Sequence, residues 1–322
     1  MTHRPDGRKR ATLRELADLT GLSPAGAHYA LRGERVSAET AARVQATAER
    51  IGFRSDPIAR ALRSGTTGVI GVIGGSLHDY WHQQFAAELG RHLRGAGRHM
   101  LLADAAGAHG TEIELAESLV DQRVDGLVVL PVDPSSPRWR SVVEAVPTVA
   151  VGPALPAPAR SIRFATERGL RLVLDRLTAL GHRRVLALTP GVHRLPVRTG
   201  LDVAECGFEP EAAARAAAAA LARDDRPTAV FGLSDALAYG ALIACRERGL
   251  AVPADVSVVG FDGHPLSDLV APRLTTVSWD TPRAAFAACR LLLGEPDATP
   301  RQVVLPPTLV ERESTAPAAS AA

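Results

Sequence analysis

The stretch TLRELADLTGLSPAGAHYALRG, from Thr12 to Gly33, predicts two short helices joined by a tight turn. Thr12 and Glu15 have the spacing of a capping box, in which each side chain bonds the backbone N–H of the other residue at a helix start. Thr20-Gly21 breaks this first helix. Ser23 is a suitable N-cap for a second helix, and Pro24 fits its first position, where a missing N–H costs nothing.

A third helix is expected to begin after Ser37, which is a further N-cap, and to end at Gly52. Its apolar residues recur at the spacing of one helix face, namely Ala41, Val44, Ala48 and Ile51. Three short helices, with a tight glycine turn between the first two, make a helix-turn-helix unit.

The segment FRSDPIARALRSG, residues 53–65, follows the third helix. Asp56-Pro57 predicts the start of one more short helix, with Ile58 and Leu62 on one side and Arg60 on the other. A helix of this length is not stable alone in water. We therefore expect it to form only when docked, as a hinge that couples its two neighbours.

The charge of the 322-residue chain is unevenly distributed. Residues 1–63 contain 12 Lys and Arg against 7 Asp and Glu, a net charge of +5, and the remainder contains 25 against 28, a net charge of −3. A basic head on a slightly acidic body favours a polyanionic partner for the head.

The sequence has no signs of a membrane, secretory or metal-binding segment. No run of about 18 uncharged apolar residues occurs, and no apolar segment follows the basic N-terminus. Cys206, Cys245 and Cys289 are widely spaced, which favours buried apolar side chains over a disulfide framework or a metal site. We expect a cytoplasmic protein without a metal or a cofactor.

From residue 66 onward, short apolar runs alternate with amphipathic helices. The expected strands are GVIGVIG, HMLLADA, DGLVVLP, TVAVG, RRVLALT, TAVFGLS, VSVVGF and LTTVSW. The expected helices lie near residues 82–96, 111–122, 166–180, 210–223, 235–248 and 283–293. Such strands indicate parallel sheets covered on both faces. We expect an α/β body of two doubly wound subdomains, with a cleft where ligands bind beyond the carboxyl ends of the strands.

The sequence resembles the lactose-repressor (LacI/GalR) family of transcription regulators. The resemblance begins in the head with TLRELADLTGLS, VSAETAARVQATAERIGF and DPIARALRSG. It continues in the family's order through DQRVDGLVVLP, LTALGHRRVLAL, PTAVFGLSDALAYGALIACRERGLAVPADVSVVGFD and PRLTTVSWD. It implies a body like that of periplasmic binding proteins, a homodimer on a palindromic DNA operator in the bacterial nucleoid, repression of transcription, and a small-molecule effector in the cleft.

In this family the second helix lies in the major groove, and the hinge helix places a leucine between base pairs in the minor groove. Leu62 matches that leucine, and packing against the body is its alternative role. The resemblance and the residue types together assign DNA binding to Thr12, Ser23, Pro24, Ala25, Gly26, His28, Tyr29, Arg32, Arg35, Ile58, Arg60 and Leu62.

The expected recognition helix departs from the family at its centre. Members usually carry Thr-Val-Ser-Arg where this chain has GAHY from residue 26. No arginine is therefore placed to read a guanine bidentately, a contact worth about 1–3 kcal/mol of discrimination. We expect Ala25, His28 and Tyr29 to set an unusual half-site, unless Tyr29 faces the core of the head. Arg32 and Arg35 are expected to contact phosphates.

The effector site is expected at the ends of the strands, where Asp104 and Asp133 also lie. Its candidate residues are Ser76, Tyr80, Trp81, Arg198, Ser234, Asp235 and Asp262. Asp235 has an alternative role as a cap of the following helix, and Trp81 has one on a dimer face. Gly152 stands where the family has a polar effector contact.

The segment between residues 190 and 226 is too short for the helix, strand and helix that the family normally fits there. We expect one short helical piece and one alanine-rich helix in it, and no strand. This departure, together with Ser234 and Gly152, predicts a changed or lost effector site.

The expected domain boundaries follow from these patterns. The head spans residues 1–54 and the hinge spans residues 55–66. The N-terminal core subdomain takes residues 67–153 and 281–298, and the C-terminal core subdomain takes residues 154–280 and 299–313. Residues 314–322, rich in Ala, Ser and Pro, are expected to form a disordered tail without a coiled coil.

Two other functions fit parts of the chain. A solute-binding protein would explain the body but not the head. A hydrolase is suggested by GLSDA from Gly232, which nearly matches a nucleophile elbow, and by Asp262 and His264 further on. Two residues in one turn rarely form the Asp–His pair of a triad, and no oxyanion motif is evident, so we expect no catalytic residues.

Overall fold

The computed structural model of the chain describes residues 11–53, 65–108, 110–191, 201–294 and 300–318. The chain divides into two units, residues 1–67 and residues 68–322, which are described separately below. None of the helices in these described ranges has both the length and the apolar character that a membrane span requires.

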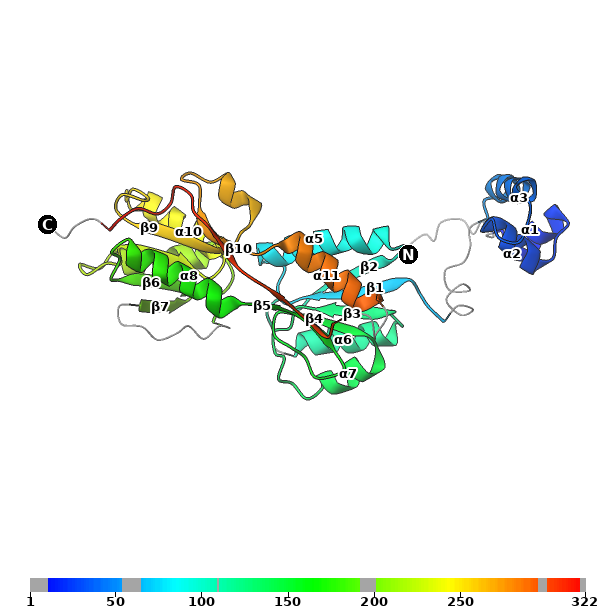
Figure 1. Cartoon of the computed structure of the whole chain (residues 1–322), viewed down its shortest axis with the longest axis horizontal. Helices are drawn as coiled ribbons and strands as arrows, with labels where there is room; N and C mark the ends of the chain where they lie inside the picture. The colour runs from blue at the N-terminus through cyan, green and yellow to red at the C-terminus, as the bar shows by residue number, and fades with distance from the viewer. Residues whose placement is uncertain (1–10, 54–64, 109, 192–200, 295–299, 319–322) are drawn as a thin grey trace, which may run out of the picture. The chain divides into compact units, whose positions relative to one another are not determined.

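The first unit contains the three expected helices, α1 (Leu13–Thr20), α2 (Pro24–Leu31) and α3 (Ala38–Ile51) (Figure 1). Each helix begins at an N-cap whose side-chain oxygen accepts a backbone N–H, and these caps are the predicted Thr12, Ser23 and Ser37. The three helices enclose a small core of Leu16, Ala30, Val44 and Ala48.

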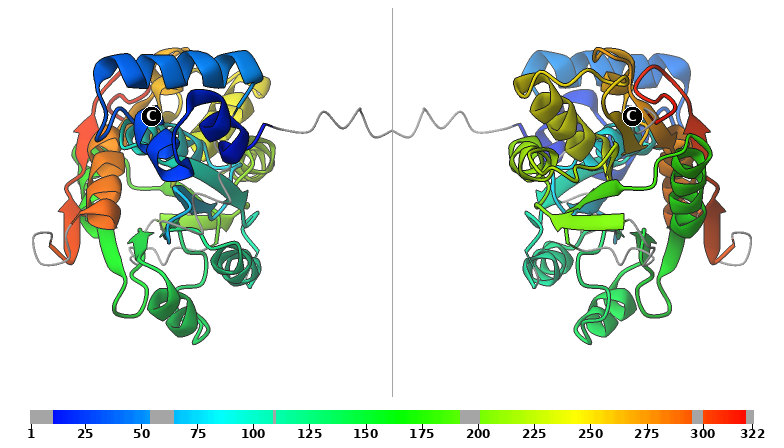
Figure 2. Two further views of the ribbon diagram at one scale, coloured as in Figure 1. Left: turned by 90° about the vertical axis from the view of Figure 1, so that its right-hand side faces the viewer. Right: turned by 90° about the vertical axis from the view of Figure 1, so that its left-hand side faces the viewer.

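The first sheet of the second unit has six parallel strands in the order β11-β5-β4-β3-β1-β2. These strands are β1 (Val69–Gly74), β2 (His99–Asp104), β3 (Gly126–Val129), β4 (Thr148–Val151), β5 (Arg160–Phe164) and β11 (Gln302–Leu305). The helices that flank it are α5 (Tyr80–Gly95) and α11 (Thr281–Leu293) on one face and α6 (Thr111–Asp121) and α7 (Trp139–Ala145) on the other (Figures 1 and 2).

The second sheet has the order β12-β10-β9-β8-β6-β7, in which only β12 is antiparallel to its neighbour. These strands are β6 (Val185–Thr189), β7 (Leu201–Glu205), β8 (Ala229–Gly232), β9 (Ser257–Asp262), β10 (Thr275–Ser278) and β12 (Thr308–Val310). Helix α8 (Thr166–Ala179) packs on one face, and α9 (Pro210–Leu221) and α10 (Asp235–Glu247) pack on the other. Both subdomains therefore have the predicted doubly wound architecture.

The chain crosses between the subdomains after β5, after β10 and after β11 (Figure 1). We expected the first crossing near residue 153, but β5 at residues 160–164 still belongs to the first sheet. We also expected residues 299–313 in the C-terminal subdomain, whereas β11 at residues 302–305 pairs with β5. The sequence of β5, RSIRF, contains two arginines and so lacks the continuous apolar run that marks a buried strand.

The expectation of no strand between residues 190 and 226 is wrong. Strand β7 pairs in parallel with β6, from Val185 opposite Leu201 to Thr189 opposite Glu205. Its sequence LDVAE gave no apolar run because β7 is an edge strand with half-exposed and exposed side chains. The connection between the two strands has 11 residues, 190 to 200, and parallel crossovers usually need about a dozen or more.

Residues 314–318 do not form the disordered tail that composition predicted. Ser314 is fully buried; its hydroxyl donates to the carbonyl of Val258 at 2.5 Å and accepts the N–H of Thr275 at 2.9 Å. The N–H of Ala316 reaches the hydroxyl of Ser257 at 3.0 Å. Composition failed here because the polar side chains of the tail find partners only on the folded sheet.

Candidate functional site

Helix α2 of the head packs through small residues and leaves its other face open. Ala27 and Ala30 are fully buried, whereas Pro24 and Ala25 are exposed and His28 is half-buried. Alanines at positions i and i+3 lie on one helix face, so the residues between them point outward. The outer face of α2 is therefore available to a partner and carries Pro24, Ala25 and His28.

Tyr29 lies outside the apolar core of the head and associates with Arg35. The guanidinium of Arg35 lies 4.7 Å from the centroid of the Tyr29 ring, and its Nη1 donates to the Tyr29 hydroxyl at 3.2 Å. Arg35 itself has a φ of +57°, so the turn after α2 adopts a left-handed conformation there. A cation–π contact of this kind contributes about 0.5–1 kcal/mol at an exposed site. Tyr29 and Arg35 thus present one aromatic and cationic unit beside α2.

The remaining candidates in the head have structural partners. Thr12 and Ser23 are helix caps whose hydroxyl oxygens accept the N–H groups of Glu15 and Gly26. Arg32 pairs with Glu34 at 2.8 Å, and both side chains are largely exposed, so this ion pair is weak and easily exchanged. The predicted hinge residues Ile58, Arg60 and Leu62 lie outside the described residues.

Several candidates in the body hold loops at the carboxyl end of the first sheet. Ser76 is only 2% exposed, and its hydroxyl accepts the N–H of His78 at 3.2 Å. Asp104 accepts the N–H groups of Leu77 and Ala106, and Asp133 accepts two bonds from Ser135. Ser76 and Asp133 are paired within their own turns, and Asp104 also joins its turn to the loop after β1, so these side chains hold the loops at the strand ends.

Ser234 and Asp235 form the N-terminus of α10. The hydroxyl of Ser234 accepts the N–H of Leu237, as an N-cap does. Asp235 is 1% exposed and accepts three hydrogen bonds, from Thr276 Oγ1 at 2.5 Å, the His264 N–H at 2.6 Å and Ser267 Oγ at 2.9 Å. Burial raises the pKa of Asp235 from 3.8 to about 6, although these bonds act in the opposite direction. Both residues therefore have the structural role that was the alternative for Asp235.

Asp262 is the candidate that most resembles a ligand-binding residue. It is half-buried at the end of β9 and has a φ of +117°, which is strained for any residue except glycine. Its removal from water raises its pKa well above the ordinary value, and the charges of Asp79 and Asp235 add to this effect. Strained backbone and a perturbed carboxyl group in one place indicate a functional position.

Asp262 is accompanied by groups from both subdomains. The ring of Tyr80, from α5, lies 5.5 Å from that of His264 and 6.3 Å from that of Tyr239. Burial lowers the pKa of His264, against the opposing charge of Asp79. We refer to Asp262, His264, Tyr80 and Tyr239 as the rim. Together with Asp79 they offer carboxylates, an imidazole and phenol rings, which suit a small polar ligand. Sequence reasoning did not assign Asp79 or Tyr239 to the site, and it weighed His264 only for a hydrolase, because none of the three matches a family motif.

Trp81 is not exposed in the cleft. It is 6% exposed, stacks on Phe85 at 5.3 Å and meets Phe164 edge-on at 5.0 Å. Its indole Nε1 donates to the hydroxyl of Thr281 at 3.1 Å. Trp81 therefore packs inside the body, and Arg198, the last predicted effector residue, lies outside the described residues.

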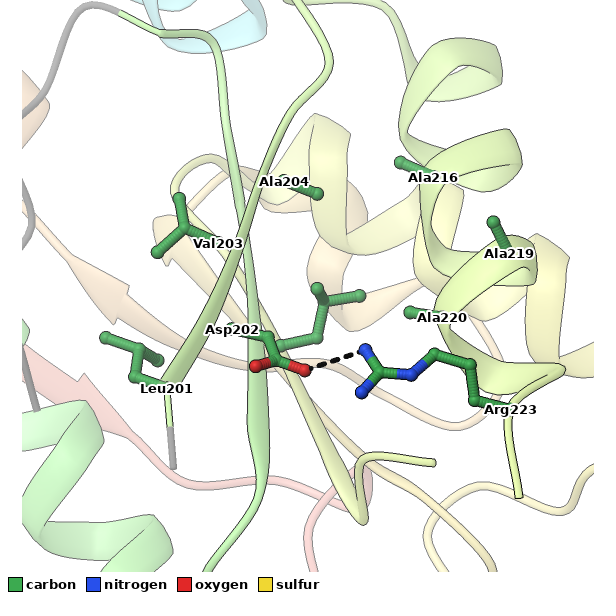
Figure 3. Close-up of a pocket in the computed structure, with 9 residues that line it drawn as sticks. Leu201, Asp202, Val203, Ala204, Ala216, Ala219, Ala220 and Arg223 are labelled. Atoms are coloured by element: carbon green, nitrogen blue, oxygen red, sulfur yellow. Dashed lines mark hydrogen bonds and ion pairs between the residues drawn. The ribbon is translucent and has the colours of Figure 1, made fainter. Parts of the chain in front are cut away.

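An open hollow of about 660 Å³ lies beside the edge strand β7 (Figure 3). Its lining comes from β6, β7 and the region of α9 and consists of Leu186, Leu201, Asp202, Val203, Ala204, Ala216, Ala219, Ala220 and Arg223. Arg223 pairs with Asp202 at 3.0 Å across its floor, in an exposed ion pair that contributes little to stability. None of the residues that line the hollow belongs to the group around Asp262.

The residues of the hydrolase alternative do not form a triad in the described part of the chain. The hydroxyl of Ser234 serves as the cap of α10, and His264 Nδ1 accepts the N–H of Leu266 at 3.2 Å. Asp262 is the last residue of β9, whereas Ser234 lies between β8 and α10. No acyl-transfer chemistry is supported by this arrangement.

Comparison with known proteins relates both units to transcription regulators. Residues 174–315 match the periplasmic binding protein-like domain family. The HTH-type transcriptional regulator MalR of Streptomyces coelicolor is 33% identical over 338 residues, which cover 95% of this chain and 97% of MalR. The ribose operon repressor of Escherichia coli K12 is 26% identical over 329 residues, which cover 94% of this chain and 99% of the repressor.

Solved structures show the same relationship. The Lac repressor dimer bound to operator and the anti-inducer ONPF superposes with a TM-score of 0.82 at 26% identity, covering 96% of this chain and 100% of that chain. The similarity to these proteins includes the helical head as well as the two subdomains. The chain therefore belongs to the LacI/GalR family of DNA-binding transcriptional regulators, and it is a regulator rather than an enzyme.

Proposed function

We propose that this chain is a repressor that binds a palindromic operator as a homodimer, in the cytoplasm at the nucleoid, with α2 as its reading helix. The outer face of α2 carries the proposal, because Ala27 and Ala30 turn inward while Pro24, Ala25 and His28 remain free. The dimeric Lac repressor on its operator supports it by analogy. Two heads related by a two-fold axis match two half-sites.

The side chains of α2 favour an unusual half-site. His28 offers one ring nitrogen at a time to a base edge, and Ala25 offers a methyl group to thymine. The unit of Tyr29 and Arg35 suits a phosphate, since the guanidinium is already oriented by the ring. Recognition thus rests on single bonds and apolar contacts in place of a bidentate arginine.

The body is proposed to control operator binding from the cleft, either through a small polar effector or without one. The rim of Asp262, His264, Tyr80 and Tyr239 supports an effector of that class. The alternative function, a solute-binding protein, does not account for a helix-turn-helix head.

The decisive experiment selects bound sites from a random duplex pool with the full-length protein. We expect enrichment of a palindrome and a steep decrease of affinity with salt, because Lys and Arg release counterions from the phosphates. Recovery of duplexes without any palindromic enrichment would contradict the proposed function.

The reading role of α2 is tested by repeating the selection with His28→Ala and Tyr29→Ala. We expect His28→Ala to enrich a different half-site, because it removes a group proposed to contact a base edge, and Tyr29→Ala to weaken binding to all sites, because it removes the ring that orients Arg35 toward a phosphate. His99→Ala, which removes an exposed histidine from β2 of the body, is the control and should leave the half-site unchanged. If His28→Ala enriches the wild-type palindrome and Tyr29→Ala binds as tightly as the wild type, α2 is a scaffold and not a reader.

A further inference from the structure

An unbroken series of aromatic rings connects the two subdomains of the body. From α5 to β8 the rings are Phe85, Trp81, Phe164, Trp279, Phe261 and Phe231. Successive centroids are 5.3, 5.0, 5.0, 5.5 and 5.9 Å apart. All of these separations fall in the range where aromatic rings attract one another.

The central rings belong to a core that both sheets share. Trp81, Trp279 and Phe261 are each 6% exposed. The cluster of buried residues that contains them extends from Ile70 in the first sheet to Val259 in the second. The two subdomains are therefore joined by packed side chains as well as by the three crossing segments.

These rings lie where the architecture usually holds a ligand. Phe164 is the last residue of β5, Trp279 directly follows β10, and Trp81 comes in the first turn of α5, after β1. In doubly wound sheets, ligands bind beyond the carboxyl ends of the strands. Trp81, Phe164 and Trp279 thus place the protein's own side chains at the strand ends, where a ligand would otherwise bind.

A hydrogen bond fixes this arrangement at a crossing segment. Trp81 Nε1 donates to Oγ1 of Thr281, the first residue of α11. The chain has just returned from the second sheet at this point, through Trp279 and Asp280. Because α5 and α11 pack together on one face of the first sheet, this bond fixes the indole of Trp81 beside the crossing segment that carries Trp279.

We propose that Trp81, Phe164 and Trp279 act as a built-in occupant of the cleft and hold the two subdomains in the operator-binding arrangement. A free effector shifts an equilibrium only through its different affinities for two states. The three rings belong to the chain itself, so they fill the cleft whatever the concentration of an effector. Operator affinity therefore no longer depends on an added effector. This inference rests on the proposed function and selects its effector-independent form.

The test removes one indole and supplies it again from solution. In Trp81→Gly, deletion of a buried indole leaves an apolar cavity of the kind that binds small aromatic molecules. We expect the affinity of the full-length variant for the selected operator to fall at least tenfold and to recover with free indole. Wild-type affinity should stay within twofold when indole, common sugars or nucleobases are added.

Trp139→Gly is the matched control. Like Trp81, Trp139 is a buried indole with a hydrogen-bonded N–H, since its Nε1 donates to the carbonyl of Asp133 at 2.9 Å. It lies in the separate core beneath α6 and α7. This variant should lose stability but keep its operator affinity within twofold, with no response of that affinity to indole.

Calorimetric unfolding tests, without DNA, whether Trp81 holds the two subdomains together. The wild-type body should unfold in one transition, and Trp81→Gly should show two that merge again with indole. Trp81→Phe keeps a ring but loses the bond to Thr281, and it should weaken operator binding about threefold. It replaces Trp81→Gly in the binding test if the glycine variant does not fold. A failed operator selection with wild type would count against the proposed function, while the calorimetric result would still decide this inference.

The inference is overturned if a folded Trp81→Gly variant unfolds in one transition and keeps wild-type operator affinity. It is equally overturned if a sugar or nucleobase changes the operator affinity of the wild type more than twofold.

Discussion

Asp235 is a candidate effector-binding residue whose carboxylate is bonded within the protein. Its carboxylate joins the N-terminus of α10 to β10 and to the short 3-10 helix η1 (Pro265–Asp268) through three donors. Such a buried network specifies how these elements pack, because each unpaired member would cost about 1–3 kcal/mol. Asp235 therefore positions the strand end that carries Asp262.

The raised pKa of Asp235 predicts a pH-dependent stability. The pKa of Asp235 is 3.8 when exposed and about 6 in the folded chain. The protonated carboxyl therefore stabilises the fold fully below pH 3.8, and this stabilisation is lost as the pH rises through 6. Asp235→Asn lacks this ionisation. We expect the unfolding free energy of the wild type, measured relative to that of Asp235→Asn, to decrease by about 2 kcal/mol from pH 4 to pH 7.

Urea unfolding at several pH values measures this difference. Asp121→Asn, which alters an exposed carboxylate at the end of α6, provides the reference. A difference that stays constant with pH for Asp235→Asn would show that this carboxylate does not titrate as burial implies.

At the scale of elements, α9 and α10 illustrate close packing built from small residues. Helix α9 has the sequence PEAAARAAAAAL, and its buried alanines face α10. Gly240 of α10 approaches the backbone of α9 so closely that an added Cβ would lie 2.7 Å from the Cβ of Ala213 and 2.9 Å from the N of Ala214. These distances are shorter than real carbon contacts, so the helices must separate to admit a methyl group.

Gly240→Ala is therefore expected to destabilise the body by about 1–3 kcal/mol, the range for overpacking a close-packed contact. Gly95→Ala is its control, because Gly95 ends α5 with no atom within 4 Å of an added Cβ. The control should be neutral or stabilising by up to about 1 kcal/mol, since alanine favours helix. Equal thermal midpoints for the two variants would refute the close approach of α9 and α10.

At the scale of the whole molecule, the last described residues complete the second subdomain. The buried Ser314 bonds to β9 and to β10, and His182 holds the carbonyl of Ala316 at 3.0 Å. Burial lowers the pKa of His182, and its two ring nitrogens bond the hydroxyl of Thr228 and the carbonyl of Ala316. The tail is thus part of the folded body.

Deletion of residues 314–322 should therefore cost about 3 kcal/mol or more of unfolding free energy, because it removes several buried hydrogen bonds and leaves partners unpaired. Deletion of residues 319–322 alone is the control. Urea unfolding compares both with the full chain. If the two deletions lower the midpoint equally, the contacts of Ser314 and Ala316 contribute nothing to stability.

The three-helix head was predictable because its signals are local. Thr12, Ser23 and Ser37 bond N–H groups three residues away, and this spacing is visible in the sequence. The buried strands β1, β3, β4 and β8 were likewise visible, since both faces of each are covered and their residues are almost all apolar. The position of Asp262 at a strand end followed from the same reasoning.

The sequence by itself therefore determined the three helices of the head and the doubly wound architecture of the body. Only the tertiary structure decided that β5 and β11 complete the first sheet, that Tyr29 contacts Arg35, and that Trp81 packs against Phe164. The physical reason is distance along the chain, because Trp81 and its partner Thr281 are 200 positions apart. No local propensity encodes such a contact, which exists only after both sheets have formed and closed on their shared core.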